Sequence, residues 1–141
     1  MPSTRERAVA DALAAVFDLT TRTSEAVAPA LDAHGLTFNT AYALWVLDPD
    51  EPAPSMREVA ERMHCTPSNL TFLATTLERQ GLIRRTPAPA DRRQRVVQLT
   101  DSGRQAREAV VAAFLRSCPL GGLGDEELSD LRRLTRRALS T

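Results

Sequence analysis

The segment from Ser55 to Thr100 decides the fold, and it reads SMREVAERMHCTPSNLTFLATTLERQGLIRRTPAPADRRQRVVQLT. Within it, Ser55 stands three residues before Glu58, and this spacing predicts a capping box at the start of a short helix. A second helix begins at Thr66 and Pro67, because threonine is a good N-cap and proline lacks the N–H that the first turn leaves unbonded. Two helices joined by so short a turn indicate a helix-turn-helix.

The second helix has an apolar face and a polar face. Gly81 is expected to end it in the left-handed conformation, and its apolar residues recur at helical spacing. The predicted buried residues are Leu70, Leu73, Ala74 and Leu77. The opposite face offers hydroxyls, an amide and a guanidinium, which can donate to and accept from base edges in a DNA major groove. The predicted DNA contacts of this helix are Thr66, Ser68, Asn69, Thr71, Phe72, Thr75 and Arg79. Phe72 either packs on a thymine methyl group or turns back to cover the helix-turn-helix core.

A two-stranded hairpin with a basic tip is predicted after the second helix. Residues 82–86 and 96–99 alternate as strands do, with Val97 and Leu99 directed inward. Prolines stiffen the first half of the connecting loop, and arginines crowd its second half. The predicted DNA contacts of the hairpin are Arg92, Arg93 and Arg95. Arg93 is expected to enter the minor groove, while Asp91 braces the loop by pairing with a neighbouring arginine.

The charge of the chain is zero in total but uneven along its length. Residues 55–100 contain eight arginines and four carboxylates, a net charge of +4, and the remaining residues carry −4. A basic segment on an acidic frame is typical of a protein that binds nucleic acid. All eighteen basic side chains are arginine, which a GC-rich coding bias explains better than selection for bidentate contacts.

Several short motifs in a fixed order resemble the winged helix-turn-helix of the MarR family of bacterial transcription regulators. They are Glu58–Met63, Leu77–Arg85, Asp91–Arg93 and Val97–Gly103. The specific part is the Asp-x-Arg loop followed at a fixed distance by Leu-Thr-x-x-Gly. The resemblance extends to 35–37 and to the helices at both ends. The chain departs from the family at Phe72, where many members carry arginine, and at Thr75, where many carry an acid, so the family does not indicate the operator sequence.

The expected fold is mainly α with a small β-wing: a winged helix-turn-helix flanked by long N- and C-terminal dimerisation helices. A single MarR-like domain is expected over 1–141, with the DNA-binding lobe at 55–100 and the dimerisation helices at 5–34 and 101–141. The flanking helices carry more apolar surface than a small core can bury, and two subunits that exchange these helices would cover it. A larger monomeric helical core is the alternative.

Details of the flanking helices follow from local patterns. A helix at 38–47 should direct Ala41, Leu44 and Leu47 to the core, with Tyr42 and Trp45 partly off that face. The helix after Thr100 is expected to place Arg104, Arg107, Glu108 and Arg116 in solvent, and Ala106, Val110, Ala113, Phe114 and Leu115 on its apolar side. Residues 120–124 are expected to form a flexible link to a last helix at 125–139.

The resemblance implies a sequence-specific transcriptional regulator, most often a repressor, that binds a palindromic double-stranded DNA operator as a homodimer. A constitutive DNA-binding regulator without an effector and a winged-helix protein–protein interaction module are the alternatives. No enzyme activity, cofactor or metal is expected, because His34, His64, Cys65 and Cys118 stand in no catalytic or metal-ligand spacing. A cytoplasmic location is expected, because no cationic leader opens the chain and no apolar run could span a bilayer.

The resemblance also implies a crevice between the flanking helices and the DNA-binding lobe, which binds a small aromatic or lipophilic effector. Five of the six aromatic residues lie outside residues 55–100. The predicted effector-binding residues are Phe17, Arg22, His34, Phe38, Tyr42, Trp45 and Phe114. The alternative for the aromatic members is packing in the core or in the dimer interface.

Overall fold

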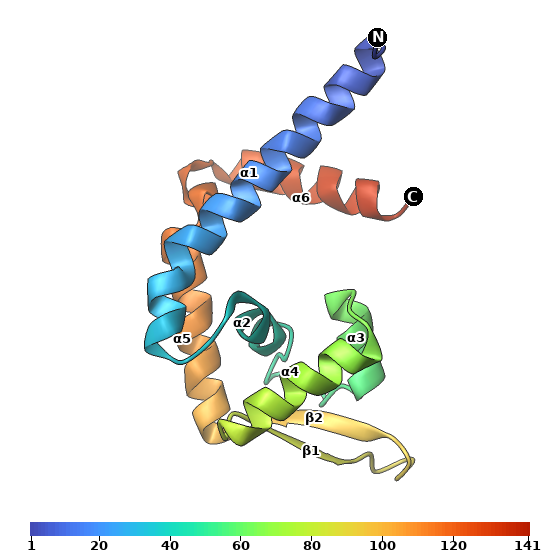
Figure 1. Ribbon diagram of the computed structural model, residues 1–141, viewed down its shortest axis with the longest axis vertical. Coiled ribbons are helices and arrows are strands. Elements are labelled where there is room, and N and C mark those ends of the chain that lie inside the picture. Colours follow the sequence, from blue (N-terminus) through green and yellow to red (C-terminus); the bar gives the residue numbers. More distant parts are fainter. The chain divides into compact units, whose positions relative to one another are not determined.

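The computed structural model describes residues 1–141, and it confirms a mainly helical fold with one small antiparallel sheet (Figure 1). The elements in chain order are α1 (Thr4–Ala33), α2 (Phe38–Trp45), α3 (Met56–Met63), α4 (Pro67–Arg79), β1 (Ile83–Pro87), β2 (Arg95–Leu99), α5 (Asp101–Ser117), the 3₁₀ helix η1 (Pro119–Gly122) and α6 (Asp125–Leu139). None of the helices combines the length and the apolar content that a membrane span requires.

The chain forms two compact units, to each of which α1 and α5 contribute. The central unit comprises 28–113 and holds the winged helix-turn-helix. The terminal unit comprises 1–27 and 114–141. The two units are described separately below.

Local side-chain caps set the helix-turn-helix of the central unit. The Ser55 hydroxyl accepts a hydrogen bond from the backbone N–H of Glu58 at 3.1 Å and caps α3, although the Glu58 side chain does not complete the expected box. His64 ends α3 in the left-handed conformation, with φ of 52°. Thr66 caps α4 and Pro67 is its first residue, as the sequence predicted. The two helices are therefore joined by a turn with little freedom.

The core of the central unit is formed by α2, α3, α4, the sheet and the first part of α5. Its most buried side chains include Leu31, Leu36, Ala41, Leu44, Leu47, Val59, Leu70, Ala74, Leu77, Ile83, Val97, Ala106, Val110 and Ala113. The predicted core face of α2 and the predicted apolar face of α4 are confirmed, with Leu73 half-buried. Tyr42 and Trp45 are partly exposed at the edge of α2, also as predicted.

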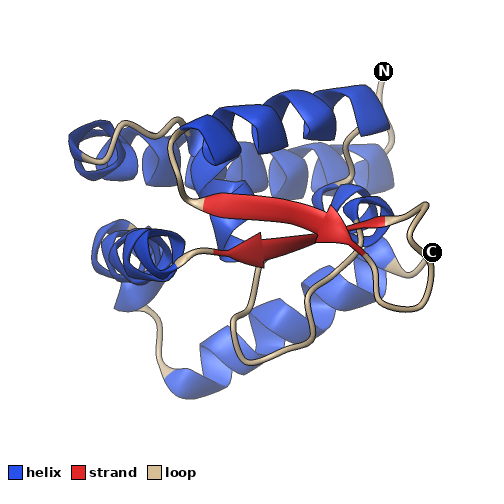
Figure 2. Cartoon of the chain, turned by 90° about the horizontal axis from the view of Figure 1, so that it is seen from below, coloured by secondary structure: helices blue, strands red, loops and turns tan.

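The two strands of the wing pair antiparallel, with Ile83 opposite Leu99 and Pro87 opposite Arg95 (Figure 2). A third segment joins this sheet, because the N–H of Val97 donates to the carbonyl of Pro54 at 2.8 Å and Ser55 bridges to Val96. The sequence indicated only a loop there. Proline cannot donate to a strand, but its carbonyl can accept, so a proline-rich segment can still attach to a sheet edge.

Two arginines from other elements bond to the end of α2, which has no basic residue in its own last turn. Arg107 donates to the carbonyl of Trp45 at 3.1 Å, and Arg62 donates to the carbonyl of Val46 at 3.3 Å. The prediction that Arg107 lies on the solvent side of α5 is therefore wrong. It is half-buried because it satisfies a helix carbonyl that lacks an intrahelical partner.

The terminal unit differs from expectation at two places. Residues 120–124 were expected to form a flexible link, but Pro119–Gly122 forms η1, with the N–H of Gly121 donating to the carbonyl of Cys118 at 3.1 Å. Leu115 was expected on the apolar side of α5, but it is 68% exposed within the single chain. Other exposed apolar side chains of this unit are Met1, Val9, Leu13, Val16, Phe17, Leu123, Leu128, Leu134 and Leu139.

Candidate nucleic-acid interface

A groove of about 720 Å³ separates α4 from the wing. Its lining residues are Ser55, Met56, Arg57, Thr71, Glu78, Arg85, Arg93, Gln94 and Arg95. They come from the start of α3, the exposed side of α4 and both strands with their connecting loop. Four arginines against one carboxylate make the groove positive, and a positive groove attracts the phosphates of nucleic acid.

The polar face of α4 is accessible. Ser68, Asn69, Phe72 and Arg79 are exposed, and Thr75 is half-buried. Three of the hydroxyls are already bonded. Thr66 accepts from the N–H of Asn69, Thr71 donates to the carbonyl of Pro67 at 2.9 Å, and Thr75 accepts from Arg85 Nη2 at 3.4 Å. Thr71 can therefore still accept but has no free hydrogen to donate. Contact between these residues and DNA stays a prediction.

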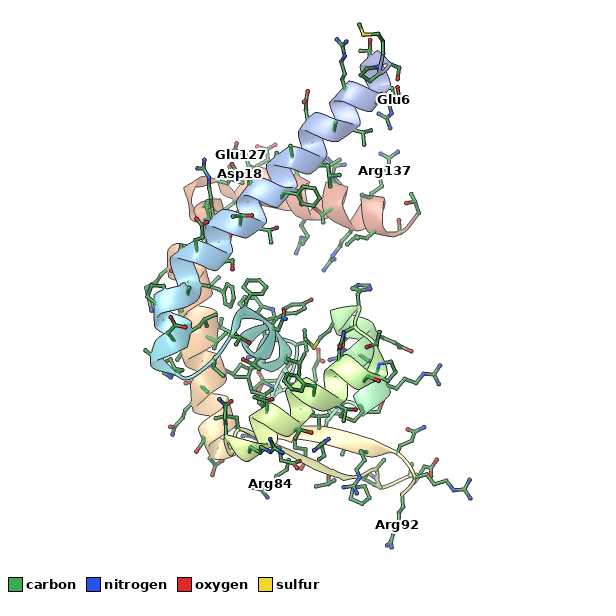
Figure 3. All side chains as sticks on the ribbon, viewed as in Figure 1. Glu6, Asp18, Arg84, Arg92, Glu127 and Arg137 are labelled. Atoms are coloured by element: carbon green, nitrogen blue, oxygen red, sulfur yellow. The ribbon has the colours of Figure 1, made fainter.

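The three predicted arginines of the wing are all exposed. Figure 3 shows Arg92 at the tip of the hairpin, pointing away from α4. Arg93 and Arg95 line the groove, and Arg95 donates to the carbonyl of Arg85 at 3.4 Å. The hairpin thus presents Arg93 and Arg95 towards the groove and Arg92 at its outer end.

Asp91 shapes the tip of the wing in a different way from the predicted one. Its carboxylate accepts from the backbone N–H of Arg93 at 3.0 Å, and its carbonyl accepts from the N–H of Gln94 at 3.0 Å. The prediction that Asp91 pairs with an arginine side chain is wrong. An aspartate can hydrogen-bond the backbone two residues ahead, and this bond leaves the guanidinium group of Arg93 available.

Glu78 and Arg85 form an ion pair between two residues that line the groove, and the sequence did not predict it as part of the site. The Arg85 Nε donates to Glu78 Oε2 at 3.2 Å, and Arg85 Nη2 donates to Oε1 at 3.2 Å. These bonds, and a further one from the Arg85 backbone N–H, hold the pKa of the Glu78 carboxyl below its ordinary value. The pair therefore remains charged at neutral pH. The signal that could have indicated it is the turn at Gly81, which reverses the chain between the two residues.

Phe72 is 72% exposed, so it does not cover the helix-turn-helix core. It lines a second cavity of about 580 Å³ between α2 and α4. The other lining residues are Thr37, Asn39, Thr40, Tyr42, Met63, Cys65, Asn69, Leu73 and Thr76. The lining contains no Asp, Glu, Lys, Arg or His, so the cavity suits an uncharged aromatic group better than an anion.

The seven predicted effector-binding residues are divided between the two units. The terminal unit holds Phe17, Arg22 and Phe114, and the central unit holds His34, Phe38, Tyr42 and Trp45. Only Tyr42 of this set lines the cavity beside α4. Arg22 is paired with Asp18 at 3.2 Å. That the seven residues share one site stays a prediction.

The remaining candidate chemistry concerns cysteine and histidine. Cys65 and Cys118 are free thiols, and the Cys118 sulfur lies 3.7 Å from the Thr23 hydroxyl. His34 and His64 are both exposed. No group of three or more His, Cys, Asp or Glu side chains is arranged to hold a metal ion.

Comparisons with known proteins agree with this architecture. A family model described as MarR family matches residues 34–94. The transcriptional activatory protein BadR of Rhodopseudomonas palustris is 32% identical over 104 residues, which are 72% of this chain and 59% of BadR. The HTH-type transcriptional repressor MdtR of Bacillus subtilis is 38% identical over 80 residues, which are 55% of this chain and 52% of MdtR. The chain thus spans little more than half the length of these curated relatives.

A solved structure gives a comparison over most of the chain. The crystal structure of CouR from Rhodococcus jostii, bound to p-coumaroyl-CoA, is 29% identical in sequence and has a TM-score of 0.73. The match covers 86% of this chain and 86% of CouR. Similarity in sequence and in structure therefore extends well beyond the motifs of residues 55–103.

Proposed function

Because the chain belongs to the MarR family of winged helix-turn-helix transcriptional regulators, we propose that it binds an operator sequence-specifically as a homodimer and represses transcription there. The observation that carries this proposal is the groove between α4 and the wing, where four arginines face one carboxylate. A winged helix that binds only protein has no need for such a groove. The two curated relatives are named as an activator and a repressor, so the direction of regulation rests on the family's commonest mode.

Specific binding is tested by fluorescence anisotropy with a duplex from the DNA upstream of the protein's own gene, the promoter duplex, and with a random duplex of equal length. We expect the promoter duplex to bind about 10³-fold more tightly or better, as is typical of specific regulators. Equal affinity for both duplexes would contradict sequence-specific binding. Failure to bind either duplex would favour the protein–protein module.

Replacing Arg93 with alanine should weaken operator binding by about 1–3 kcal/mol, because its guanidinium group is free to enter the minor groove. The slope of log affinity against log salt concentration should become shallower by about one unit. The reason is that the variant lacks one positive side chain that neutralises a DNA phosphate. Arg116→Ala is the control, because Arg116 is exposed on α5 and lies outside the groove. Affinity and salt slope that are both unchanged in Arg93→Ala would exclude the contact.

We propose that a small aromatic effector binds in the cavity between α2 and α4. The support is its wall of α4 residues, its uncharged lining and the aromatic side chains of Tyr42 and Phe72. The p-coumaroyl-CoA bound to CouR is a further support for the aromatic part of the effector, because it carries an aromatic group and binds a protein of similar structure. An effector that favours the non-binding arrangement of the dimer would release DNA only to the extent that it binds that arrangement more tightly.

Titration of the operator complex with uncharged phenols and esters, beside salicylate-like acids, tests the effector site. We expect release by the uncharged compounds, and Tyr42→Ala should raise the midpoint for release about tenfold, the loss of one aromatic contact. Operator affinity without effector should be the same in Tyr42→Ala and the parent. If no compound in a broad panel alters operator affinity, the protein is a constitutive DNA-binding regulator.

A further inference from the structure

The ion pair between Glu78 and Arg85 joins the two elements that flank the groove. Glu78 lies in the last turn of α4, and Arg85 lies in the middle of β1. Its two side-chain bonds are parallel, Nε to Oε2 and Nη2 to Oε1, both at 3.2 Å. The backbone N–H of Arg85 also donates to Oε2 at 3.1 Å. A bidentate pair with a third bond to the backbone fixes the plane of the guanidinium group as well as its position.

This pair is the centre of a larger set of hydrogen bonds. Arg85 Nη2 also donates to the Thr75 hydroxyl at 3.4 Å, and Thr75 is a predicted base-contacting residue of α4. On the other side, Arg95 Nη1 donates to the Arg85 carbonyl at 3.4 Å, and Arg95 lines the groove. Helix α4 and the wing are thus connected through polar side chains in the groove.

A carboxylate in this groove opposes DNA binding, because it repels the phosphates that the surrounding arginines attract. The side chains are only partly accessible, at 22% for Arg85 and 40% for Glu78. The bonds to Glu78 use the Nε and Nη2 groups of Arg85, which leaves Nη1 to donate to DNA. The carboxylate therefore reduces the attraction for any DNA while it fixes the direction of one arginine.

We propose that Glu78 is a positioning residue for sequence discrimination, which holds Arg85 so that α4 and the wing meet the operator in one fixed register. The inference rests on the proposed function, since it requires that the groove binds DNA. By this proposal, Glu78 lowers the affinity for DNA of any sequence and raises the preference for the operator over other sequences. Both effects can be measured in one variant.

Glu78→Gln keeps the shape of the side chain and removes its charge. Its affinity for a scrambled duplex should rise about threefold at 0.1 M salt, with a steeper salt slope, because Arg85 is released to the phosphates. Its preference for the operator over the scrambled duplex should fall about tenfold, roughly what one mismatched base pair costs. A residue with only a structural role would instead lower both affinities together with the melting temperature.

Glu61→Gln is the matched control. Glu61 pairs with Arg57, another arginine of the groove, at 3.2 Å, but both residues lie on α3 and the pair connects no other element. This variant also removes one negative charge and frees one groove arginine. It should raise the affinity for both duplexes equally and leave their ratio unchanged.

The double variant Glu78→Arg, Arg85→Glu restores a pair of opposite charges between α4 and β1, and it should recover part of the lost preference. An unchanged operator preference in Glu78→Gln, while the parent still discriminates, would overturn the role of Glu78 and leave the proposed function intact. An equal fall in preference in Glu61→Gln would also overturn it, because charge alone would then explain the effect. If the parent itself prefers neither duplex, the proposed function fails and the inference fails with it.

Discussion

Replacing Gly103 with alanine is expected to destabilise the central unit by about 3 kcal/mol, at the upper end of the usual cost of overpacking. A Cβ atom built on Gly103 would lie 1.8 Å from the carbonyl oxygen of Leu82 and 2.9 Å from its carbonyl carbon. These atoms belong to the backbone, so no side chain can rotate away to make room. The helix and the start of the wing would have to separate.

The segment that would have to move is held by several hydrogen bonds. The Leu82 carbonyl accepts from the N–H of Thr100 at 3.0 Å. The Thr100 hydroxyl donates to the carbonyl of Gly81 at 2.6 Å and accepts from the N–H of Gly103 at 3.0 Å. A shift that relieves the clash would strain this set, which joins the end of α4, the end of the wing and the start of α5.

Urea unfolding of Gly103→Ala measures the effect directly. Gly121→Ala is the control, because a Cβ atom on Gly121 meets no atom within 4 Å. The control should change the free energy of unfolding by no more than about 0.5 kcal/mol, as is usual for a surface substitution. A similarly small change in Gly103→Ala would mean that the close approach to Leu82 is not required.

Features that depend on a few neighbouring residues could be predicted from the sequence. The cap of Ser55 on α3, the cap of Thr66 on α4 and the left-handed Gly81 all use groups within four residues of each other. The bounds of α6 were also predicted, because its first turn is acidic and its last turn is basic. Local chemistry of this kind is visible before any packing is known.

Features that join distant elements could not be predicted. Arg107 is sixty-two residues from Trp45, and its helical face alone suggested solvent. Glu78 and Arg85 lie within one recognised motif, yet only the chain reversal at Gly81 brings their side chains together. The glycine of the Leu-Thr-x-x-Gly motif was noted as a resemblance, and its physical reason is the backbone of Leu82. Such contacts depend on how elements pack, and periodicity does not contain that information.

The terminal unit exposes apolar side chains that a single chain leaves in water. The side chains that are more than half exposed include Val16 and Phe17 on α1, Leu115 on α5, and Leu134 and Leu139 on α6. Burial of such surface is favourable by about 25 cal/mol per Å². A second copy of the chain, related by a two-fold axis, presents the same surface and can cover it. This is the basis for proposing that these helices form the dimer interface.

Replacing Leu134 with glutamate should therefore convert the proposed dimer to monomers and abolish operator binding, because a single copy of α4 contacts only half of a two-fold site. Leu134 is 52% exposed, so the helix itself does not need this side chain to fold, and glutamate is a good helix former. Deletion of Asp125–Thr141 should give monomers or aggregates with the same loss of DNA affinity. Ser129→Glu is the control and should remain a dimer, because Ser129 is exposed and lies about 140° around α6 from Leu134. Light scattering after size-exclusion chromatography measures the mass of each variant. A stable dimer after either the deletion or Leu134→Glu would mean that α6 does not form the dimer interface.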